Sequence, residues 1–344
     1  MKTLAAILFE QHKPLVVDEV ELPRLGYGQV LVEVKVSRIC GSQLGEIDGV
    51  KGPDMYLPHL LGHEAGGVVC EVGPEVSNVK SGDHVVLHWR PSVGIQARPA
   101  KYRLGTKTVN AGNITTFQRL TVVSENRLTP IPADVDFEVA SLLADTLTTG
   151  FGSVMRNARL EIGESAIVIG VGGIGLGTVL GAHLAGAHPL IAVDLYEDKL
   201  TKAREFGATH TINSRTEDLV GEVARILGGT ADVVFDGTGN PAVIEQAWKV
   251  ISPKGRLILI GVMPNDLQLT FNTLPLHYGR VLSGSEGGMS QPETDIPRLL
   301  RMIRDGRFDP RGMVSHRCAL KDINRAISLM REGQSVHTMI HLDQ

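Results

Sequence analysis

The sequence has few cysteines, few aromatic residues and no long apolar run, and each shortage argues against a class of protein. The three cysteines, Cys40, Cys70 and Cys318, are an odd number and lie far apart, which argues against a disulfide framework. Aromatic residues make up only 4% of the chain and leave little material for stacking on nucleic-acid bases. No apolar stretch approaches the ~20 residues of a membrane-spanning helix.

An excess of charge is also lacking. The formal net charge is -4, so no basic field favours nucleic acid or a membrane surface as a partner. The first residues, MKTLAAILFEQHKPLVV, are too short in their apolar part and too soon charged for a secretory signal. We therefore predict a cytoplasmic protein that binds neither nucleic acid nor membranes.

The length of 344 residues suits two domains, and the first part of the chain has the pattern of short strands and turns. In QVLVEVKVS (29–37), valines alternate with charged residues. The segment GGVVCEVGPEVSNVKSGDHVVLHW (66–89) indicates two strands around a Gly-Pro turn. This part of the sequence predicts an antiparallel, barrel-like region.

The pattern changes after about residue 147, where short apolar strands alternate with helical segments. The predicted strands are SAIVIG (165–170), PLIAVD (189–194), HTIN (210–213), ADVVFDGTG (231–239), GRLILIG (255–261) and VLSGS (281–285). Such alternation predicts a parallel sheet covered by helices on both faces.

The last ~60 residues leave this pattern, with helices predicted near 294–306 and 321–332 and a final strand at HTMIHL. The predicted fold class is therefore α/β. A β-rich domain of residues 1–146 and 285–344 is interrupted by a doubly wound, parallel-sheet domain of residues 147–284.

A glycine-rich turn lies between the first strand and the first helix of the doubly wound domain. In VIGVGGIG, Gly170, Gly172 and Gly175 have G-x-G-x-x-G spacing, and the same turn includes Gly173 and Ile174. Glycines there allow a tight turn and a close approach to a pyrophosphate, which the free N–H groups of the helix N-terminus bind. The turn predicts a dinucleotide site, with a methyltransferase-type fold that binds another adenosine ligand as the alternative.

An acidic residue after the next strand indicates which dinucleotide is bound. Asp194 follows Gly175 by 19 residues (194 − 175), where a carboxylate accepts hydrogen bonds from ribose hydroxyls and repels a 2′-phosphate. Because DLYEDK (194–199) supplies no arginine, we predict NAD rather than NADP. Lys199 is predicted to cover the adenosine, with a solvated helix lysine as the alternative.

Two segments of the β-rich domain carry side chains that suit a metal. His63 and Glu64 lie together in LPHLLGHEAGG (57–67), and Cys40 precedes them in SRICGSQLGEIDG (37–49). A thiolate and a neutral imidazole from separate loops suit tetrahedral zinc, and a catalytic site needs a third ligand and an open position. By themselves these residues also fit an ordinary turn and a small buried cysteine.

Five motifs together resemble one family over nearly the whole chain. ICGS, GHEAGGVVCEVG, VKSGDHVV, VIGVGGIGLG and VDLYEDKLTKAREFGA occur in the order seen in zinc-dependent medium-chain alcohol and polyol dehydrogenases. The resemblance implies a GroES-like catalytic domain (1–146 and 285–344) and a Rossmann coenzyme domain (147–284). It also implies a homodimer or homotetramer that acts on a small-molecule alcohol.

The resemblance implies three zinc ligands, of which Cys40 and His63 are two. The third family position falls on Asp145, which without the resemblance is better explained as a helix-cap or turn aspartate. One thiolate, one carboxylate and Zn²⁺ sum to zero charge, so the buried site needs no further counter-ion. Glu64 resembles the carboxylate that approaches the zinc when water or product exchanges.

The chain departs from the family pattern in two places. Relatives often carry four cysteines for a structural zinc after the GDHVV strand, but no cysteine lies between Asp83 and Asp145. We therefore predict one catalytic zinc per chain and no structural zinc. Ser42 resembles the hydroxyl that hydrogen-bonds the alcohol, but Gly45 stands where relatives often have a relay histidine. The proton path beyond Ser42 is unassigned, with His59 and His88 as alternatives to ordinary polar histidines.

The implied reaction is hydride transfer from an alcohol to NAD. Zinc acts as a Lewis acid that lowers the pKa of the alcohol, and Ser42 takes or passes the proton. By resemblance, further coenzyme contacts fall on Thr149, Ile174, Val262, Ser285 and His337. The substrate pocket includes Trp89, Phe117 and Glu286, with Arg90 nearby. Its polar members favour polyols or sugar alcohols, and a core tryptophan is the alternative for Trp89.

Two other functions are weighed against this one. A zinc-free NAD(P)H-dependent quinone or enoyl reductase has the same fold but lacks the cysteine, histidine and acidic residue. A non-enzymatic nucleotide-binding protein would be expected to have lost a ligand, and none is lost here. Metal analysis distinguishes the first alternative, and NAD reduction with an alcohol distinguishes the second.

Overall fold

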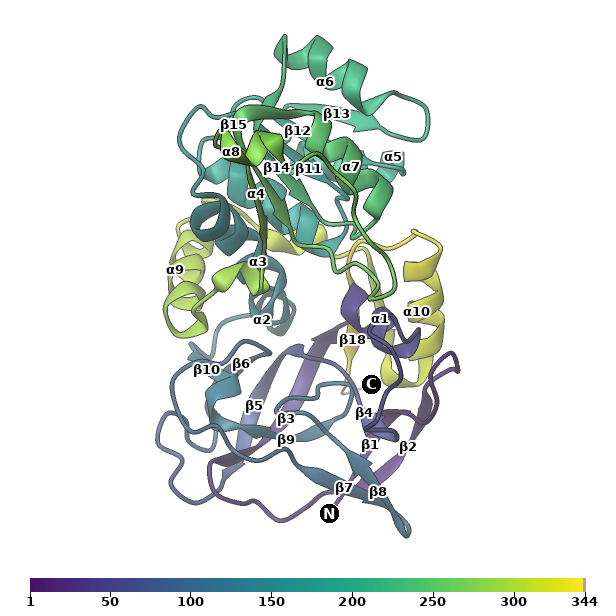
Figure 1. The fold of residues 1–344 in the computed structure, drawn as a ribbon. Helices are drawn as coiled ribbons and strands as arrows, with labels where there is room; N and C mark the ends of the chain where they lie inside the picture. The colour runs from purple at the N-terminus through teal and green to yellow at the C-terminus, as the bar shows by residue number, and fades with distance from the viewer. Residues whose placement is uncertain (343–344) are drawn as a thin grey trace. The chain divides into compact units, whose positions relative to one another are not determined.

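The computed structural model describes residues 1–342, and it divides into two compact units. The first unit comprises Met1–Asp145 and Gln291–Gln344, and the second comprises Thr146–Ser290. Figure 1 shows the first unit in purple, blue and yellow and the second in teal and green. The second unit begins one residue before the predicted coenzyme domain and ends six residues after it (290 − 284). Among the described residues, no helix has the length and apolar character to cross a membrane.

The first unit contains a closed barrel of short strands. In order around the barrel these are β1 (Lys2–Leu8), β2 (Val16–Glu21), β7 (Lys101–Leu104), β8 (Lys107–Asn110) and β4 (His59–Leu60). Small and β-branched side chains fill it around Tyr102, which is fully buried. Its phenol oxygen accepts from the backbone N–H of Val122, so the buried hydroxyl has a partner.

A seven-stranded sheet forms the rest of the β structure in this unit. Its order is β10 (Leu128–Ile131), β6 (His84–His88), β5 (Glu64–Val72), β3 (Gln29–Arg38), β18 (Thr338–His341) and β17 (His316–Ala319), with β9 (Leu120–Ser124) also paired to β3. The central strand β3 is the alternating segment of the sequence, and its valines are buried as their spacing predicts. It joins the N-terminal and C-terminal parts of the chain, since Arg38 pairs with Met339.

The described part of the first unit has four α-helices, α1 (Gly41–Ile47), α2 (Phe137–Ala144), α9 (Pro292–Arg304) and α10 (Ile323–Arg331). Of these, α2, α9 and α10 contact strands of this sheet. Helix α2 packs closely on β5 because Gly66 lacks a side chain: a Cβ there would lie 2.7 Å from Ala140 Cβ and 2.9 Å from the Phe137 carbonyl. Gly66, the second glycine of GHEAGG, therefore sets the distance between β5 and α2.

A buried glutamate organises the cysteine-free segment that follows β6. Glu125 Oε1 accepts from the backbone N–H groups of Ser77 and Asn78 at 2.7 and 2.8 Å, and Oε2 accepts from Ile95 at 2.7 Å. Burial raises the pKa of Glu125, but these backbone donors outweigh burial and hold it below the usual value. A carboxylate with three backbone donors thus holds together segments that are distant in sequence.

The second unit is built on six parallel strands. Their order is β13 (His210–Asn213), β12 (Leu190–Asp194), β11 (Ala166–Ile169), β14 (Ala231–Asp236), β15 (Ile251–Leu259) and β16 (Val281–Gly284). In chain order this is 3-2-1-4-5-6, so the order reverses between β11 and β14. The inner strands β12, β11 and β14 are almost entirely buried, as expected where both faces are covered, and the predicted α/β fold class is confirmed.

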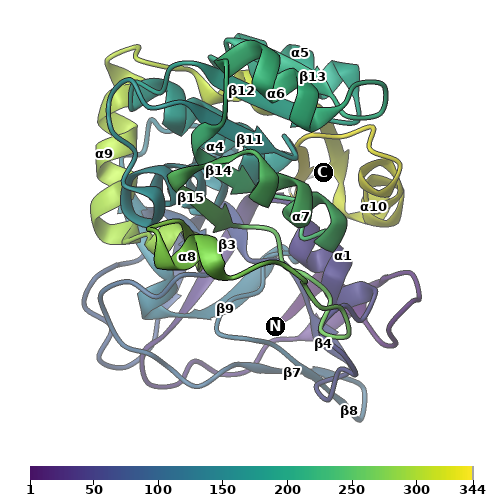
Figure 2. The same ribbon diagram turned by 45° about the horizontal axis from the view of Figure 1, so that its top comes forward.

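The α-helices of this unit are α3 (Thr146–Gly152), α4 (Gly173–Leu184), α5 (Glu197–Glu205), α6 (Leu219–Leu227), α7 (Pro241–Lys249) and α8 (Leu274–His277). Helices α4, α5 and α7 pack on the sheet, and α3 packs on α4. Helix α4 contacts α5, and α6 contacts α7. Figure 2 shows α4 and α7 close to the strands β11, β14 and β15. Since crossovers between parallel strands are right-handed, the two pairs are expected on opposite faces of the sheet.

Short irregular helices complete the described chain. They are the 3₁₀ turns Glu125–Arg127, Gly287–Met289, Pro310–Met313 and Leu320–Asp322, and the π-helical turn Ser153–Ala158.

Candidate metal centre and coenzyme site

Cys40 lies between the end of β3 and the start of α1. It is the N-cap residue of α1, and its backbone N–H donates to Gln43 Oε1 at 2.8 Å. The cysteine is 9% exposed, so its sulfur is nearly removed from solvent. The cap fixes the backbone at the point where the Cys40 side chain leaves it.

His63 lies in the turn between β4 and β5, and the glycine before it makes that turn feasible. Gly62 has φ +90°, and a Cβ there would lie 2.4 Å from Thr116 Oγ1 and 2.7 Å from Phe117 Cδ1. The glycine of the GHE motif is thus required by backbone geometry and by close packing. It lets His63 enter the site directly before the strand that begins with Glu64.

Asp145 is the C-cap residue of α2, so the helix carries it to the site. The other end of α2 is capped by Asp136, whose carboxylate accepts from the N–H groups of Glu138 and Val139. Glu138 is held in turn by Arg317, with Nε and Nη2 donating at 2.6 and 2.8 Å. These contacts, together with the close packing at Gly66, fix the helix that ends at Asp145.

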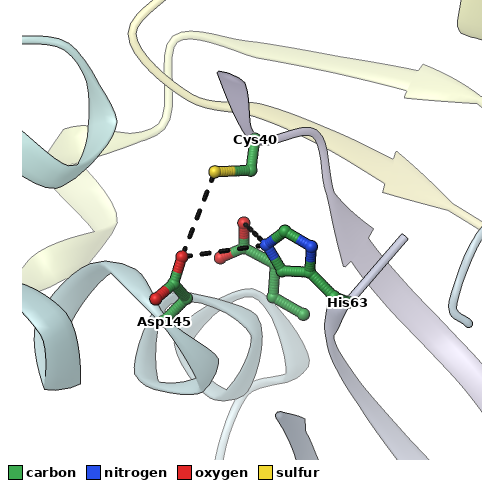
Figure 3. A group of neighbouring side chains, drawn as sticks. Cys40, His63 and Asp145 are labelled. Atoms are coloured by element: carbon green, nitrogen blue, oxygen red, sulfur yellow. Dashed lines mark hydrogen bonds and ion pairs between the residues drawn. The ribbon is translucent and has the colours of Figure 1, made fainter. Parts of the chain in front are cut away.

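The three predicted ligands converge on one point (Figure 3). Asp145 Oδ2 lies 4.0 Å from Cys40 Sγ and 3.8 Å from His63 Nε2. Ligand atoms on a tetrahedral zinc, bound at ~2.0–2.3 Å, are about 3.3–3.6 Å apart, so small movements would close the site around the ion. Among residues 1–342 this is the one group of three or more Cys, His, Asp or Glu side chains with metal-site spacing, and Glu64 belongs to it.

The charges around His63 favour a positive charge at this point. Burial lowers the pKa of His63, but its contacts with Asp145 and Cys40 and the nearby negative charges raise it well above its usual value. A proton on the imidazole and a cation bound in its place are alternatives, so metal binding releases the proton. The site therefore has the residue types, spacing and electrostatics that fit Zn²⁺.

Gln43, which the sequence did not single out, contacts two of the three ligand residues. Its Nε2 lies 2.5 Å from His63 Nδ1, while its Oε1 accepts from the Cys40 backbone N–H. Because an amide Nε2 only donates, Nδ1 accepts in this arrangement and the proton of a neutral ring lies on Nε2. A metal at Nε2 needs the proton on Nδ1 instead, so metal binding would require the Gln43 amide to turn its oxygen to the ring.

Trp89 also contacts a ligand, although the sequence placed it only in the substrate pocket or the core. Its indole Nε1–H donates to Asp145 Oδ1 at 3.0 Å, which leaves Oδ2 toward Cys40 and His63. The two residues are 56 positions apart, and no local pattern marks their contact. The structure thus brings together a predicted pocket residue and a predicted ligand.

The proton-transfer candidates are placed as follows. Ser42 Oγ lies 3.5 Å from His63 Nε2, at the centre of the cluster. His59 is hydrogen-bonded to Asp54 at 2.7 Å. His88 is fully buried, bonded to the Arg90 carbonyl and Thr129, and burial lowers its pKa to about 4. Only Ser42 lies within the cluster, and the two histidines have structural partners.

The glycine-rich turn of the second unit has the geometry of a dinucleotide site. Gly170 follows β11 with φ +84°, and a Cβ on Gly175 would lie 2.0 Å from the Gly170 carbonyl oxygen. Gly172 is the N-cap of α4, and a Cβ there would meet nothing within 4 Å. The first and third glycines are thus required by the turn itself, while the second leaves open space over the helix N-terminus, which Gly173 begins.

Asp194 lies at the end of β12, next to this turn. Its Oδ2 accepts from the Val171 N–H at 2.9 Å, and its Oδ1 accepts from the Leu195 N–H at 2.8 Å. Lys199 lies over the Tyr196 ring, and Arg215 lies 5.1 Å from the centroid of the same ring. No arginine is a chain neighbour of Asp194, but the fold places Arg215 in the same region, since the N–H of Ser214 donates to the Asp194 carbonyl at 3.1 Å.

The remaining predicted coenzyme residues of the second unit lie in several elements. Thr149 is buried in α3, Ile174 is half-buried in the first turn of α4, and Val262 is 64% exposed. Ser285 is hydrogen-bonded to Ser153 and Asn157, both at 2.9 Å. The predicted pocket residue Glu286 is exposed and caps the turn Gly287–Met289.

Two predicted residues of the first unit are buried in ways the sequence did not indicate. Phe117 lies in the hydrophobic core with no exposed surface, so core packing accounts for this side chain. His337 is also fully buried, and its Nδ1 lies 3.0 Å from Arg38 Nη1. The contact that the structure gives His337 is thus with an arginine of the same unit, and its role at the pyrophosphate stays a prediction.

Sequence comparison places the chain among known dehydrogenases. Residues 26–133 match the family model described as the alcohol dehydrogenase GroES-like domain, and residues 173–305 match the one described as zinc-binding dehydrogenase. The S-(hydroxymethyl)glutathione dehydrogenase of Paracoccus denitrificans is 34% identical over 375 residues, which cover 99% of this chain and all of that protein.

Solved structures agree with this placement. The alcohol dehydrogenase zinc-binding domain protein from Burkholderia ambifaria matches with a TM-score of 0.91 at 27% identity. Benzyl alcohol dehydrogenase from Acinetobacter calcoaceticus matches with 0.89 at 25% identity, and each match covers 99% of both chains. The predicted zinc-dependent activity on alcohols is thereby confirmed, and a zinc-free reductase or non-enzymatic protein is not favoured. The chain belongs to the zinc-dependent medium-chain alcohol dehydrogenase family.

Proposed function

We propose that this alcohol dehydrogenase uses NAD and a single zinc ion held by Cys40, His63 and Asp145. The observation that carries the proposal is the spacing of Sγ, Nε2 and Oδ2, with Oδ2 lying 4.0 and 3.8 Å from the other two atoms. All three ligand atoms come from different parts of the chain and meet in a nearly solvent-free position, which a chance grouping of polar side chains seldom provides.

The residues of the site divide the work of alcohol oxidation among them. Zinc, when bound, supplies a Lewis acid that lowers the pKa of the substrate hydroxyl. Ser42, whose hydroxyl lies 3.5 Å from His63 Nε2, is positioned to accept the hydroxyl proton and pass it on. Trp89 holds Asp145 in the orientation that binding requires, because its indole N–H occupies Oδ1 and leaves Oδ2 for the metal.

The coenzyme is assigned to the turn of Gly170 to Gly175. Backbone N–H groups at the start of α4 bind the pyrophosphate, and Asp194 accepts hydrogen bonds from the adenosine ribose. Lys199 covers the adenosine, while Thr149, Ile174, Val262 and Ser285 contact the nicotinamide half. The preference is for NAD because a 2′-phosphate would meet the Asp194 carboxylate.

The substrate is an alcohol, and Glu286 and Arg90 favour one with further hydroxyl groups. The relatives named above act on S-(hydroxymethyl)glutathione and benzyl alcohol. A panel of these two, simple alkanols, polyols and sugar alcohols, each with NAD and NADP, ranks the candidates by kcat/KM. A polyol below benzyl alcohol in that ranking contradicts the preference.

Zinc count and assembly are tested on the same purified protein. Elemental analysis is expected to give one zinc per chain, and none or two contradicts the proposal. Light scattering is expected to give a dimer or tetramer, and fractionation of the source cells is expected to place the protein in the cytoplasm.

A further inference from the structure

A fully buried arginine lies beside the candidate metal centre. Arg38 is the last residue of β3 and is 1% exposed. Arg38 continues the every-second-residue series of Val30, Val32, Val34 and Val36. Its side chain therefore points to the same buried face of the sheet. An ionised side chain is seldom placed there unless specific groups compensate its charge.

The compensating group is Glu64, which Arg38 holds with two hydrogen bonds. Arg38 Nε donates to Glu64 Oε2 at 2.8 Å, and Nη2 donates to Oε1 at 2.5 Å. Both carboxylate oxygens are therefore in use. Two N–H donors facing two oxygens fit the ionised carboxylate, because a carboxylic acid proton would meet a donor. Burial raises the pKa of Glu64, and the Arg38 charge opposes that rise.

The remaining nitrogen of the Arg38 guanidinium, Nη1, also has a partner. Arg38 Nη1 lies 3.0 Å from His337 Nδ1, and since arginine only donates, this nitrogen accepts. Arg38 is thus anchored by His337, the residue directly before β18, while it holds Glu64 of β5.

Glu64 lies as close to the cluster as the proposed ligand Asp145. Its Oε1 is 3.7 Å from His63 Nε2, while Asp145 Oδ2 is 3.8 Å from the same atom. Distance alone therefore gives Glu64 the position of a fourth ligand. The difference between the two carboxylates is their partner: Asp145 accepts from a neutral indole, and Glu64 is held at both oxygens by a cation.

The charges around the site also distinguish Asp145, as a metal ligand, from Glu64, as the partner of Arg38. The Cys40 thiolate and the Asp145 carboxylate balance Zn²⁺, and Glu64 then adds one uncompensated negative charge. Arg38 supplies the matching positive charge, and the nearby Glu64 and Cys40 charges raise its pKa further above its usual value although burial opposes this. The buried group is neutral only with Arg38 included.

We propose that Arg38 is a positioning residue that keeps the Glu64 carboxylate from binding the metal and so keeps the fourth coordination position open to substrate. The inference rests on the proposed function, because it needs a metal at Cys40, His63 and Asp145. A residue that only stabilised the fold would not affect the coordination of the ion.

The test is cobalt(II) substitution, whose visible spectrum reports the number and type of ligands. In the wild-type protein an added ligand such as azide or imidazole is expected to shift the d–d bands. In Arg38→Met the freed Glu64 occupies the fourth position, so azide leaves the spectrum unchanged. Zinc affinity, measured by competition with a chelator, is expected to rise on the order of tenfold in this variant.

The double variant Arg38→Met/Glu64→Gln is the matched control, because a neutral pair replaces the ion pair. It is expected to regain the azide response and the wild-type zinc affinity. An azide response in Arg38→Met equal to that of wild type overturns the proposal, as does a double variant that stays unresponsive. If Arg38→Met does not fold, Arg38→Lys is the second variant. Lysine keeps the positive charge but bonds only one carboxylate oxygen, so this variant is expected to lose part of the azide response. An azide response equal to that of wild type overturns the proposal as well.

Failure of the proposed function gives a different result. If the wild-type protein binds no zinc or cobalt, or keeps the metal when Cys40 is replaced, then the metal centre itself is wrong. If the wild-type protein binds one ion and the Arg38 variants behave like wild type, then only the role of Arg38 is wrong.

Discussion

The two units carry sites of opposite construction. In the second unit one short turn, Gly170 to Gly175, presents backbone N–H groups, and the side chains around it are small or absent. In the first unit the site consists of side chains that are separated by up to 105 positions and are brought together by β3, β5 and α2. A backbone site is encoded locally and tolerates side-chain changes, whereas a side-chain site depends on each residue and on its buried neighbours.

Loss of a metal ligand is the largest effect that this comparison predicts. Cys40→Ser should remove zinc and lower kcat by roughly 10³-fold or more, because a Lewis acid contributes several kcal/mol to such a reaction. Zinc analysis and steady-state kinetics on the same preparation measure both. Cys70→Ser, at an exposed cysteine, is the control and should retain both zinc and activity. Zinc retained in Cys40→Ser would contradict the assignment.

Ser42→Ala should have the next largest effect. Removal of a positioned proton-transfer group costs on the order of 10²-fold in kcat, while zinc content stays at the wild-type level because Ser42 is no ligand. Ser42→Thr keeps the hydroxyl and should keep most of the activity. A deuterated alcohol shows whether hydride transfer limits the rate; near-wild-type turnover of Ser42→Ala with a full isotope effect would exclude the role of Ser42.

Gly45→His tests whether a histidine at this position can supply the proton relay that the chain lacks. A Cβ at Gly45 would lie 3.6 Å from Val50 Cβ, an ordinary contact, so helix α1 accommodates a β-carbon there. Gly45→His is expected to shift the pH–rate profile without loss of zinc. A profile identical to that of wild type would mean that the proton does not pass this position.

Much of the fold could be predicted from the sequence because its signals are local. The G-x-G-x-x-G turn and the alternation in β3 depend on neighbours a few positions apart. The contacts between Arg38 and Glu64 and between Trp89 and Asp145 depend on strand pairing and helix packing, 26 and 56 positions apart. The sequence did contain one indication of the Arg38–Glu64 contact. Arg38 occupies the same alternating, buried series as the β3 valines, and a charged residue in such a series indicates a buried partner.

The prediction for Glu125 concerns stability rather than catalysis. In Glu125→Gln one amide oxygen cannot serve Ser77, Asn78 and Ile95 together, so at least one partly buried backbone donor loses its carboxylate partner, which costs about 1 kcal/mol. Because the pKa of Glu125 is lowered in the folded protein, its contribution is full above the usual glutamate pKa and is lost as the pH falls through the lowered value.

Chemical denaturation at several pH values measures this difference. The gap between wild type and Glu125→Gln should be largest at neutral pH and close on acidification, whereas Glu71→Gln, at an exposed position of β5, should show no gap. A gap that does not vary with pH would mean that the charge of Glu125 contributes nothing.

Trp89→Phe tests a single hydrogen bond of the side-chain site. Phenylalanine keeps an aromatic ring but cannot donate to Asp145 Oδ1, so zinc affinity should fall by about 10- to 100-fold, as for other residues that orient metal ligands. Chelator competition measures the change. Trp248→Phe, in the core of the second unit, should leave zinc affinity unchanged. Equal affinity in Trp89→Phe would return Trp89 to a pocket or packing role.

The smallest effect is expected in the backbone site. Asp194→Asn keeps one oxygen for the Val171 or Leu195 N–H but removes the negative charge that a 2′-phosphate would meet. We expect the ratio of kcat/KM for NAD to kcat/KM for NADP to fall about tenfold, or ~1.4 kcal/mol, mostly because kcat/KM for NADP rises. Asp198→Asn, on the neighbouring helix, should leave the ratio unchanged. Zinc content should not vary in either variant, because the second unit carries none of the proposed ligands. A wild-type protein that uses NADP as well as NAD would show that Arg215 and Lys199, rather than Asp194, dominate the field at the ribose.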